Sequence, residues 1–266
     1  MTTIAVLCDP PRDGLVLTAL PETSPLSTTE ATELYTAMLQ DACRAVEASG
    51  GELLVNYRPD DALPEHDGQT KTVESELESE PKSESKDEAE AHVRAVVDNT
   101  LDDPDVARFE RQVGETFSGR AGNTATHLLE REGVGTVAIV KPNAPFLSRQ
   151  QIDTAAMKLR RSPVILGPST DGRVYYAGFR ETIDYADAYT APAVETLTDR
   201  AIDAGHEVDF LPQFPVVESG TDLAEALALI RARQRAGRLV PEHTTAFLDS
   251  LGLSIVECEH GLDLTR

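Results

Sequence analysis

Positive charge is scarce in this 266-residue chain. Lysine and arginine together number 24, against 46 aspartates and glutamates, so the formal net charge is −22 and the isoelectric point is about 4.5. A protein that holds nucleic acid through its phosphates needs a basic surface, and so does one that docks on anionic lipid. We therefore expect neither nucleic acid nor a membrane as a partner.

Long apolar runs and clustered cysteines are also missing. No run approaches the ~18 apolar residues of a membrane-spanning helix. The N-terminus MTTIAVLCDP lacks a basic region before its short apolar run, which predicts a first strand rather than a signal peptide. Cys8, Cys43 and Cys258 are far apart in the sequence, which argues against a disulfide framework and a cysteine zinc site. We expect a cytoplasmic protein with reduced thiols.

Common catalytic motifs are missing as well. The sequence contains no GxSxG, HExxH or GxGxxG, and its six histidines are dispersed. The sequence therefore does not match the motifs of the common hydrolase, zinc-protease or dinucleotide-binding sites.

Lysine is rare even among the basic residues, numbering five of the 24. A surface rich in carboxylates and nearly free of lysine is typical of proteins from halophiles that accumulate salt. At molar salt the Debye length falls to about 3 Å, so such carboxylates repel one another and an anionic ligand only weakly. We interpret the chain as halophilic, and an ordinary acidic protein with a disordered tail is the alternative.

Residues 65–92 form a distinct acidic segment. Ten of them are acidic and few are apolar, so burial cannot offset the entropy of ordering them. Similar strand-like and helix-like segments flank this stretch, which predicts a disordered insertion within a single domain, residues 1–266, rather than a linker. An acidic interaction tail is the alternative. Residues 239–266 are interpreted as a C-terminal extension.

Outside this segment, short apolar strands alternate with helical patterns. Ser27-Thr-Thr-Glu30 is a capping box, and the wholly apolar run at 136–140 is typical of a central parallel strand. Strands are expected at 4–8, 52–57, 136–140, 163–167, 174–179, 207–211 and 253–258. Helices are expected at about 28–46, 104–118, 121–132, 148–161 and 191–204, from residue 219 or 221, and at 241–251.

This alternation predicts an α/β fold, with an open, mostly parallel sheet flanked by helices on both faces. Ligands of such sheets lie beyond the carboxyl ends of the strands. We therefore expect the ligand site to be formed by the segments after residues 8, 140 and 167.

Turn-forming and polar residues follow each of these strands. Asp9-Pro-Pro-Arg12-Asp-Gly14 is a tight turn whose N–H groups could approach a phosphate, although an ordinary turn has the same composition. In Lys141-Pro-Asn143 the amide could bind a base, a sugar hydroxyl or a metal, or only shape a turn. The segment Gly167–Gly178, with its tyrosine pair, predicts either a cleft wall or a hairpin with core tyrosines.

Three carboxylates complete the candidates. Asp171 is the candidate catalytic residue because it lies at the ligand edge of the sheet, although stabilisation of a turn is the alternative. Glu218 and Asp222 lie four residues apart before a helix. We expect Asp222 to cap that helix and Glu218 to face the cleft.

Taken together, these segments resemble a little-characterised family of bacterial and archaeal proteins with the glycosyltransferase-A, or nucleotide-diphospho-sugar transferase, fold. The family's Gly-Pro-x-x-Asp-Gly-Gly-Tyr-Tyr-x-x-Gly segment is matched by Gly167–Gly178, with one residue extra. Its Asp-x-Asp-Thr-x-x-Asp-Leu segment is matched by Val216–Leu223, its Gln-x-Gly segment by Gln112-Val-Gly114, and its Pro-x-x-Gly turn by Pro11–Gly14. The match covers roughly residues 4–235, as in a divergent, haloarchaeal-type member.

The resemblance implies a nucleotide or nucleotide sugar as the ligand, with Mg²⁺ or Mn²⁺ bridging its phosphates and the family's carboxylates. The residues that it implies for the nucleotide are Asp9, Arg12, Gly14, Thr18, Gln112, Gly114, Asn143, Gly167, Pro168 and Tyr175. The residues that it implies for the metal are Glu218 and Asn143, because hard cations are bound by oxygen.

The sequence departs from the family at positions where the family has charged residues that the resemblance implies for phosphate and metal binding. Asp9 replaces a basic residue, Leu17 and Ala19 replace a lysine and an arginine, and Asn143 replaces an aspartate. A charge-assisted phosphate contact contributes about 1.5–3 kcal/mol, so these changes weaken binding unless Arg12 or Lys141 compensates.

Two hypotheses follow. The first is a nucleotide-sugar-dependent glycosyltransferase or a nucleotidyltransferase of unknown substrate, with a degenerate phosphate and metal site. The second is a catalytically inactive member that serves as a binding or scaffold protein. The sequence leaves the substrate and the oligomeric state open.

Overall fold

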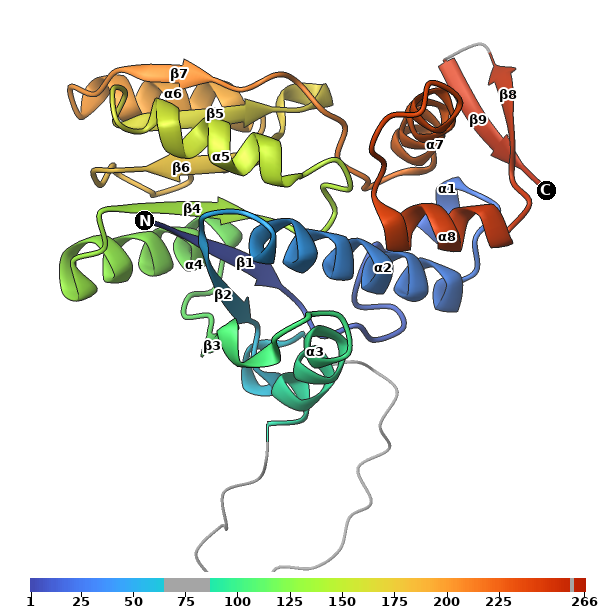
Figure 1. Ribbon diagram of the computed structural model, residues 1–266, viewed down its shortest axis with the longest axis horizontal. Helices are drawn as coiled ribbons and strands as arrows, with labels where there is room; N and C mark the ends of the chain where they lie inside the picture. Colours follow the sequence, from blue (N-terminus) through green and yellow to red (C-terminus); the bar gives the residue numbers. More distant parts are fainter. Residues whose placement is uncertain (65–86, 259–260) are drawn as a thin grey trace, which may run out of the picture.

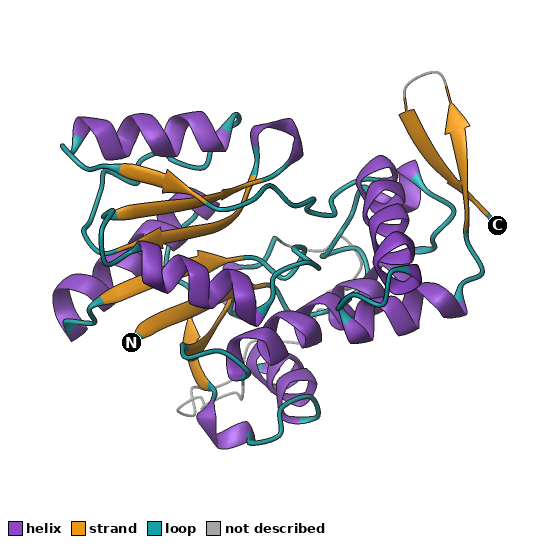
Figure 2. Cartoon of the chain, turned by 45° about the horizontal axis from the view of Figure 1, so that its top comes forward, coloured by secondary structure: helices purple, strands orange, loops and turns teal. Residues whose placement is uncertain are grey.

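A computed structural model describes residues 1–64, 87–258 and 261–266. Within these residues, seven strands form one open sheet in the order β3-β2-β1-β4-β6-β5-β7, and every neighbouring pair is parallel except those that involve β6 (Figure 1). Helices lie on both sides of the sheet (Figure 2). The predicted α/β fold, an open, mostly parallel sheet flanked by helices, is confirmed.

The strands of the sheet are β1 (Thr2–Cys8), β2 (Glu52–Tyr57), β3 (Arg108–Arg111), β4 (Thr136–Val140), β5 (Val164–Pro168), β6 (Val174–Phe179) and β7 (Val208–Phe210). The α-helices are α1 (Leu20–Thr23), α2 (Thr28–Glu47), α3 (Glu88–Asp98), α4 (Phe117–Thr126), α5 (Arg149–Lys158), α6 (Ala193–Asp203), α7 (Gly220–Arg235) and α8 (Glu242–Ser250). Short helical turns are η1 (Asp60–Ala62), η2 (Pro104–Val106) and η4 (Thr170–Gly172), and the π-helical η3 (His127–Glu132) continues α4.

The alternation of side chains along β1 divides the core between the two faces of the sheet. Ile4, Val6 and Cys8 pack with apolar residues of α2, α3 and α5, whereas Ala5 and Leu7 pack with those of α4 and α6. All of these residues are buried, and complete burial of an aliphatic side chain contributes about 1.5–3 kcal/mol. The central strands are apolar throughout because helices cover both of their faces.

A third apolar cluster lies beyond the carboxyl edge of the sheet. There α7 and α8 pack against α1 and the first half of α2, whose predicted capping box is confirmed. Asp41 of α2 accepts hydrogen bonds from the backbone N–H groups of His243 and Thr244 at 2.9 and 2.8 Å, and so caps α8. The strand predicted at 253–258 forms as β8 (Ser254–Cys258), but its partner is β9 (Gly261–Thr265), in a separate two-stranded sheet.

The helix predicted at 104–118 is wrong. That stretch holds η2, the edge strand β3 and a loop, and α4 begins only at Phe117. Residues Arg108–Arg111 form a strand instead of a helix because pairing with the open edge of β2 satisfies their backbone hydrogen bonds, while Phe109 packs against the core.

The acidic segment predicted to be disordered at 65–92 needs a correction at its end. Residues 65–86 lie outside the described part of the chain, but Asp87 caps α3, and residues 88–92 form its first turns. Ala89, Val93 and Val97 recur at helical spacing and are buried. This apolar face stabilises a helix that the acidic composition of the stretch conceals.

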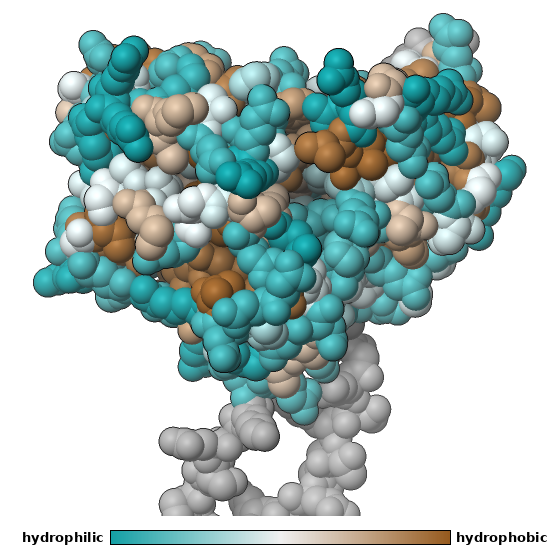
Figure 3. Space-filling model, viewed as in Figure 1, coloured by the Kyte–Doolittle hydropathy of each residue, from teal (hydrophilic) through white to brown (hydrophobic). Residues whose placement is uncertain are grey.

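Hydrophilic residues cover most of the face seen in Figure 3. In the described part of the chain, no helix is both long enough and apolar enough to cross a membrane.

Gly220 sets the distance between α7 and α1. Its N–H donates to the Thr23 hydroxyl at 2.9 Å, and a Cβ at this position would overlap the carbonyl oxygen of Thr23. We expect Gly220→Ala to lower the free energy of unfolding by about 1–3 kcal/mol, because backbone has to move to relieve the overlap. Gly135→Ala, where a Cβ meets open space, is the matched control. Urea denaturation measures the free energy of unfolding of both variants. Equal values for Gly220→Ala and Gly135→Ala would contradict the close packing of α7 against α1.

Candidate functional site

A cleft of about 350 Å³ lies at the carboxyl ends of β1 and β4. From β1 the sheet extends through β2 to β3 on one side and through β4 on the other, and such a switch point is where open α/β sheets place their ligands. Six parts of the chain contribute residues to its walls. They are Leu7–Asp9, Leu15–Ala19, Tyr35, Gln112 with Phe117 and Arg120, Lys141–Asn143, and Glu218.

Asp9 places a carboxylate at the end of β1. Its backbone N–H donates to the Tyr35 hydroxyl at 2.9 Å, and that hydroxyl donates to the Asp9 carbonyl at 3.2 Å, so α2 fixes the strand end. Burial raises the pKa of the Asp9 carboxyl, although Arg58, Arg120 and Lys141 act in the opposite direction. The nearest cation is Arg58, whose Nη1 lies 3.9 Å from Asp9 Oδ1.

Gln112 and Arg120 form a second wall. Gln112 Nε2 donates to the carbonyls of Cys8 and Asn56 at 3.0 and 2.7 Å, and Gln112 Oε1 accepts from Arg120 Nε at 2.7 Å. The Gln112 amide therefore ties β1 to β2 and orients a buried guanidinium. Burial lowers the pKa of Arg120, and Arg58 acts in the same direction.

Arg120 was not among the residues predicted from the sequence. Its cleft position depends on the hydrogen bond from Gln112, which lies eight residues earlier. The local sequence around Arg120 carries no signal for this contact.

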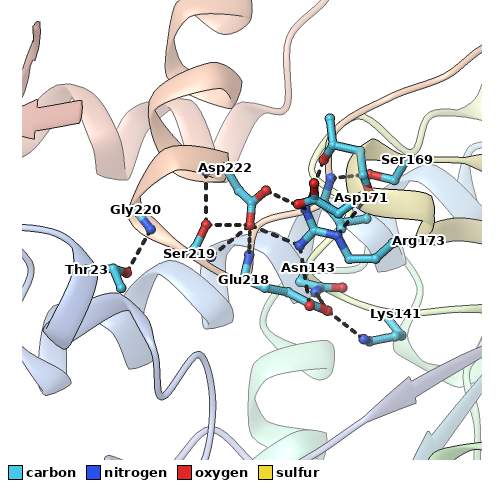
Figure 4. A network of polar contacts seen from close by, with 12 residues as sticks. Thr23, Lys141, Asn143, Ser169, Asp171, Arg173, Glu218, Ser219, Gly220 and Asp222 are labelled. Carbon is cyan, nitrogen blue, oxygen red and sulfur yellow. Dashed lines mark hydrogen bonds and ion pairs between the residues drawn. The ribbon is translucent and has the colours of Figure 1, made fainter. Parts of the chain in front are cut away.

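Lys141, Asn143 and Glu218 meet at the end of β4 (Figure 4). Glu218 Oε1 accepts from Lys141 Nζ at 2.9 Å and from Asn143 Nδ2 at 3.0 Å. Burial acts to raise the pKa of Glu218, but the attraction of Lys141 and then of Arg173 holds that pKa below its ordinary value. The expectation that Glu218 faces the cleft agrees with its place in the lining.

Arg173 joins the turn before β6 to the start of α7 (Figure 4). Its Nη1 lies 3.0 Å from Asp222 Oδ2 and 3.4 Å from Glu218 Oε2, and its Nη2 contacts Asp222 Oδ1. Asp222 also accepts from the backbone and the hydroxyl of Ser219, which completes the capping box of α7. The expected capping role of Asp222 is thus present, together with an ion pair that the sequence did not predict.

The loop after Gly14 forms the remaining wall. Gly14 has φ 75°, and the Leu15 N–H closes a turn on the Arg12 carbonyl at 3.1 Å. Leu17 also has a positive φ, 47°, which is unfavourable for a branched side chain. Thr18 lines the cleft and is exposed, so its hydroxyl can meet a ligand.

The structure brings Asp9, Thr18, Gln112, Asn143 and Glu218 together around one cleft. The other residues implied by the family resemblance lie elsewhere, and local contacts explain their positions.

Arg12 and Gly114 lie outside the lining. Arg12 Nη1 pairs with Asp60 at 2.6 Å and Arg12 Nε donates to His92 at 3.2 Å, which directs the side chain toward α3. Gly114 has φ 132° and allows the close approach of Arg120 and Gly119 at the start of α4.

Gly167, Pro168 and Tyr175 belong to the core and the turn of the β5–β6 pair. A Cβ at Gly167 would lie 2.6 Å from the Tyr175 ring, and the Tyr175 hydroxyl donates to the Pro212 carbonyl at 2.9 Å. Of the two alternatives for this segment, the structure shows the hairpin with core tyrosines. Asp171 lies in the turn with an 81% exposed side chain, 3.2 Å from Arg173, and does not line the cleft.

No protein-family model matches this chain, and neither does any curated protein sequence. Among solved structures, it is similar to a provisionally assigned nucleotide-diphospho-sugar transferase from Desulfovibrio desulfuricans G20, at 19% identity with a TM-score of 0.68 over 94% of each chain. The chain has a nucleotide-diphospho-sugar transferase-like fold.

Two further matches are more distant. The 4-diphosphocytidyl-2C-methyl-D-erythritol synthase from Anaerococcus prevotii is 12% identical, with a TM-score of 0.49 over 86% of this chain and 96% of that one. A CMP:2-keto-3-deoxy-manno-octonic acid synthetase, solved with CTP, is 12% identical, with a TM-score of 0.47 over 87% of this chain and 99% of that one.

The ion pair of Arg173 with Asp222 generates a pH prediction. Burial acts to raise the pKa of Asp222, but hydrogen bonds from Arg173 and Ser219 outweigh it and leave the pKa lowered. The stabilisation is therefore present above the unfolded pKa, about 3.9, and is lost as the pH falls through the folded pKa. We expect Asp222→Asn to cost about 3 kcal/mol at neutral pH and to flatten the loss of stability in acid.

Asp209→Asn is the matched control for this prediction, because Asp209 is also paired, at 2.6 Å with Lys158, but is 45% exposed. An exposed pair contributes at most about 1 kcal/mol. Urea denaturation across pH measures both variants, and equal losses would contradict a stabilising role specific to the Arg173 pair.

Proposed function

We propose that this protein is a nucleotidyl- or glycosyltransferase that binds the nucleotide part of its substrate in the cleft between the ends of β1 and β4. One observation carries the proposal: the cleft lies at the switch point of a nucleotide-diphospho-sugar transferase-like fold, and Lys141 and Arg120 supply positive charge there.

The cations of the cleft are suited to phosphate. Lys141 is 38% exposed and also lies 5.2 Å from the Phe117 ring centroid, so its ammonium is accessible to a ligand. A phosphate has to draw Lys141 from Glu218, and it gains a charge-assisted contact of about 1.5–3 kcal/mol. Arg120 contributes a second, buried positive charge to the cleft wall, and its guanidinium is oriented by Gln112.

The polar groups of the cleft are suited to a sugar or a base. Thr18 offers an exposed hydroxyl, and Asn143 has a buried amide oxygen with no hydrogen-bond partner among the described residues. The net charge of −22 does not oppose such a ligand at molar salt, where about 3 Å of solution screens an exposed charge.

A catalytically inactive binding protein is the second candidate. Asp171, the proposed catalytic residue, is exposed in a turn outside the cleft lining, and Asp9, Leu17 and Ala19 stand where the resembling family has cations. An inactive protein retains nucleotide binding but forms no product, so an assay of nucleotide-sugar turnover separates the two candidates.

Binding is tested by calorimetric titration of nucleoside diphosphates, nucleoside triphosphates and nucleotide sugars in molar KCl. We expect saturable binding, and we expect Lys141→Ala to weaken it by about 10–100-fold, the loss of one charge-assisted contact. Lys158→Ala is the matched control, since Lys158 pairs with Asp209 away from the cleft. The absence of binding at millimolar ligand, or equal effects of the two variants, would contradict the proposed site.

A further inference from the structure

The guanidinium of Arg173 lies between two carboxylates at the edge of the cleft (Figure 4). It contacts Glu218 and Asp222, the latter through both oxygens. Its Nε and Nη2 also bond the carbonyl and the hydroxyl of Thr170 at 3.1 and 2.9 Å. Every nitrogen of Arg173 therefore has an acceptor, and the side chain is held from three directions.

The residues present do not fit the Mg²⁺ or Mn²⁺ ion that the family resemblance implies. Such ions take several oxygen ligands in near-octahedral geometry. Here Lys141 and Arg173 already pair with Glu218, and Asn143 directs its NH₂ group toward the same carboxylate. In the described part of the chain, no three His, Cys, Asp or Glu side chains are grouped to hold a metal ion.

We propose that the guanidinium of Arg173 takes the place of a divalent cation between Glu218 and Asp222, so that the cleft binds its nucleotide without a metal ion held by the protein. This inference rests on the proposed function, because it concerns the same cleft. A fixed side chain then supplies the positive charge that a dissociable ion otherwise brings.

The sequence around Arg173 departs from that of the resembling family. Where the resembling family has Asp-Gly-Gly, this chain has Asp171-Gly172-Arg173, and one extra residue precedes the tyrosine pair. The structure absorbs that residue as a bulge, because Gly167 pairs with Tyr176 and Pro168 with Val174. A bulge redirects the neighbouring side chains, and Arg173 directly precedes β6, next to this bulge.

The charge on Arg173 is permanent under ordinary conditions. The hydrogen bond to Asp222 raises the pKa of Arg173, and burial only partly opposes this. A divalent ion bound by Glu218 and Asp222 would be repelled by this guanidinium, which lies within hydrogen-bond distance of both carboxylates. Removal of the guanidinium should therefore open the two carboxylates to a cation.

The test is a titration of the whole protein with Mn²⁺ in molar KCl, in which electron paramagnetic resonance measures the free ion. We expect no saturable site in the wild type, and one site in Arg173→Gln that binds at least about tenfold more tightly than the wild-type background, a difference of about 1.4 kcal/mol. Arg149→Gln is the control for net charge, because Arg149 pairs with Asp153 on the surface. It should behave as the wild type.

A wild-type Mn²⁺ site that Glu218→Gln abolishes would overturn the inference. So would a folded Arg173→Gln protein that gains no site. If Arg173→Gln does not fold, Mn²⁺ titrations of the wild type and of Glu218→Gln still show whether the wild type has a metal site that depends on Glu218.

A second measurement needs no variant of Arg173. Nucleotide affinity of the wild type is compared in EDTA and in Mg²⁺, and we expect the two values to agree within about twofold, less than 0.5 kcal/mol. An affinity at least about tenfold higher in Mg²⁺ that Glu218→Gln removes would overturn the inference. If no nucleotide binds in either solution, the proposed function fails, and the Mn²⁺ titration still decides whether Arg173 occupies a cation site.

Discussion

The pairing of Arg173 with Asp222 and Glu218 is the interaction on which the arrangement of the cleft depends. It connects the turn before β6 to the first turn of α7, two segments that are separated by 49 positions between Arg173 and Asp222. Burial of such charges is costly, and the pair persists because Thr170 and Ser219 satisfy the remaining donors and acceptors. Glu218 then lies where Lys141 can reach it from β4.

The other charged groups of the cleft are also held by neighbouring side chains. Glu218 is shared by two cations, Asp9 is a buried carboxylate whose pKa is raised, and Arg120 is a buried cation held by an amide. Positive and negative groups are therefore interleaved around a small space rather than gathered into one basic pocket. The ligand proposed above would gain affinity by replacing contacts between paired side chains, and discrimination between ligands would then depend on how well each replaces them.

The order of elements was predictable because local signals and burial agree for most of the chain. The capping box at Ser27 and the apolar run at 136–140 are signals of this kind, and both correspond to observed elements. The signals failed where a partner elsewhere in the chain decides the outcome. Arg108–Arg111 becomes a strand because the edge of β2 is open to it, and residues 88–92 become helical because their few apolar side chains meet the core.

Sequence alone predicted most of the alternation of strands and helices. It also selected Asp9, Thr18, Gln112, Asn143 and Glu218, which line one cleft. These follow from periodicity, turn chemistry and the resemblance of short motifs, all of which are local. The tertiary structure alone decided that Arg120 belongs to the cleft, that Gly167 and Tyr175 belong to the core, and that Arg173 lies between Glu218 and Asp222. The physical reason is that a charged side chain is directed by its nearest partners, and here those partners come from parts of the chain that only folding brings together.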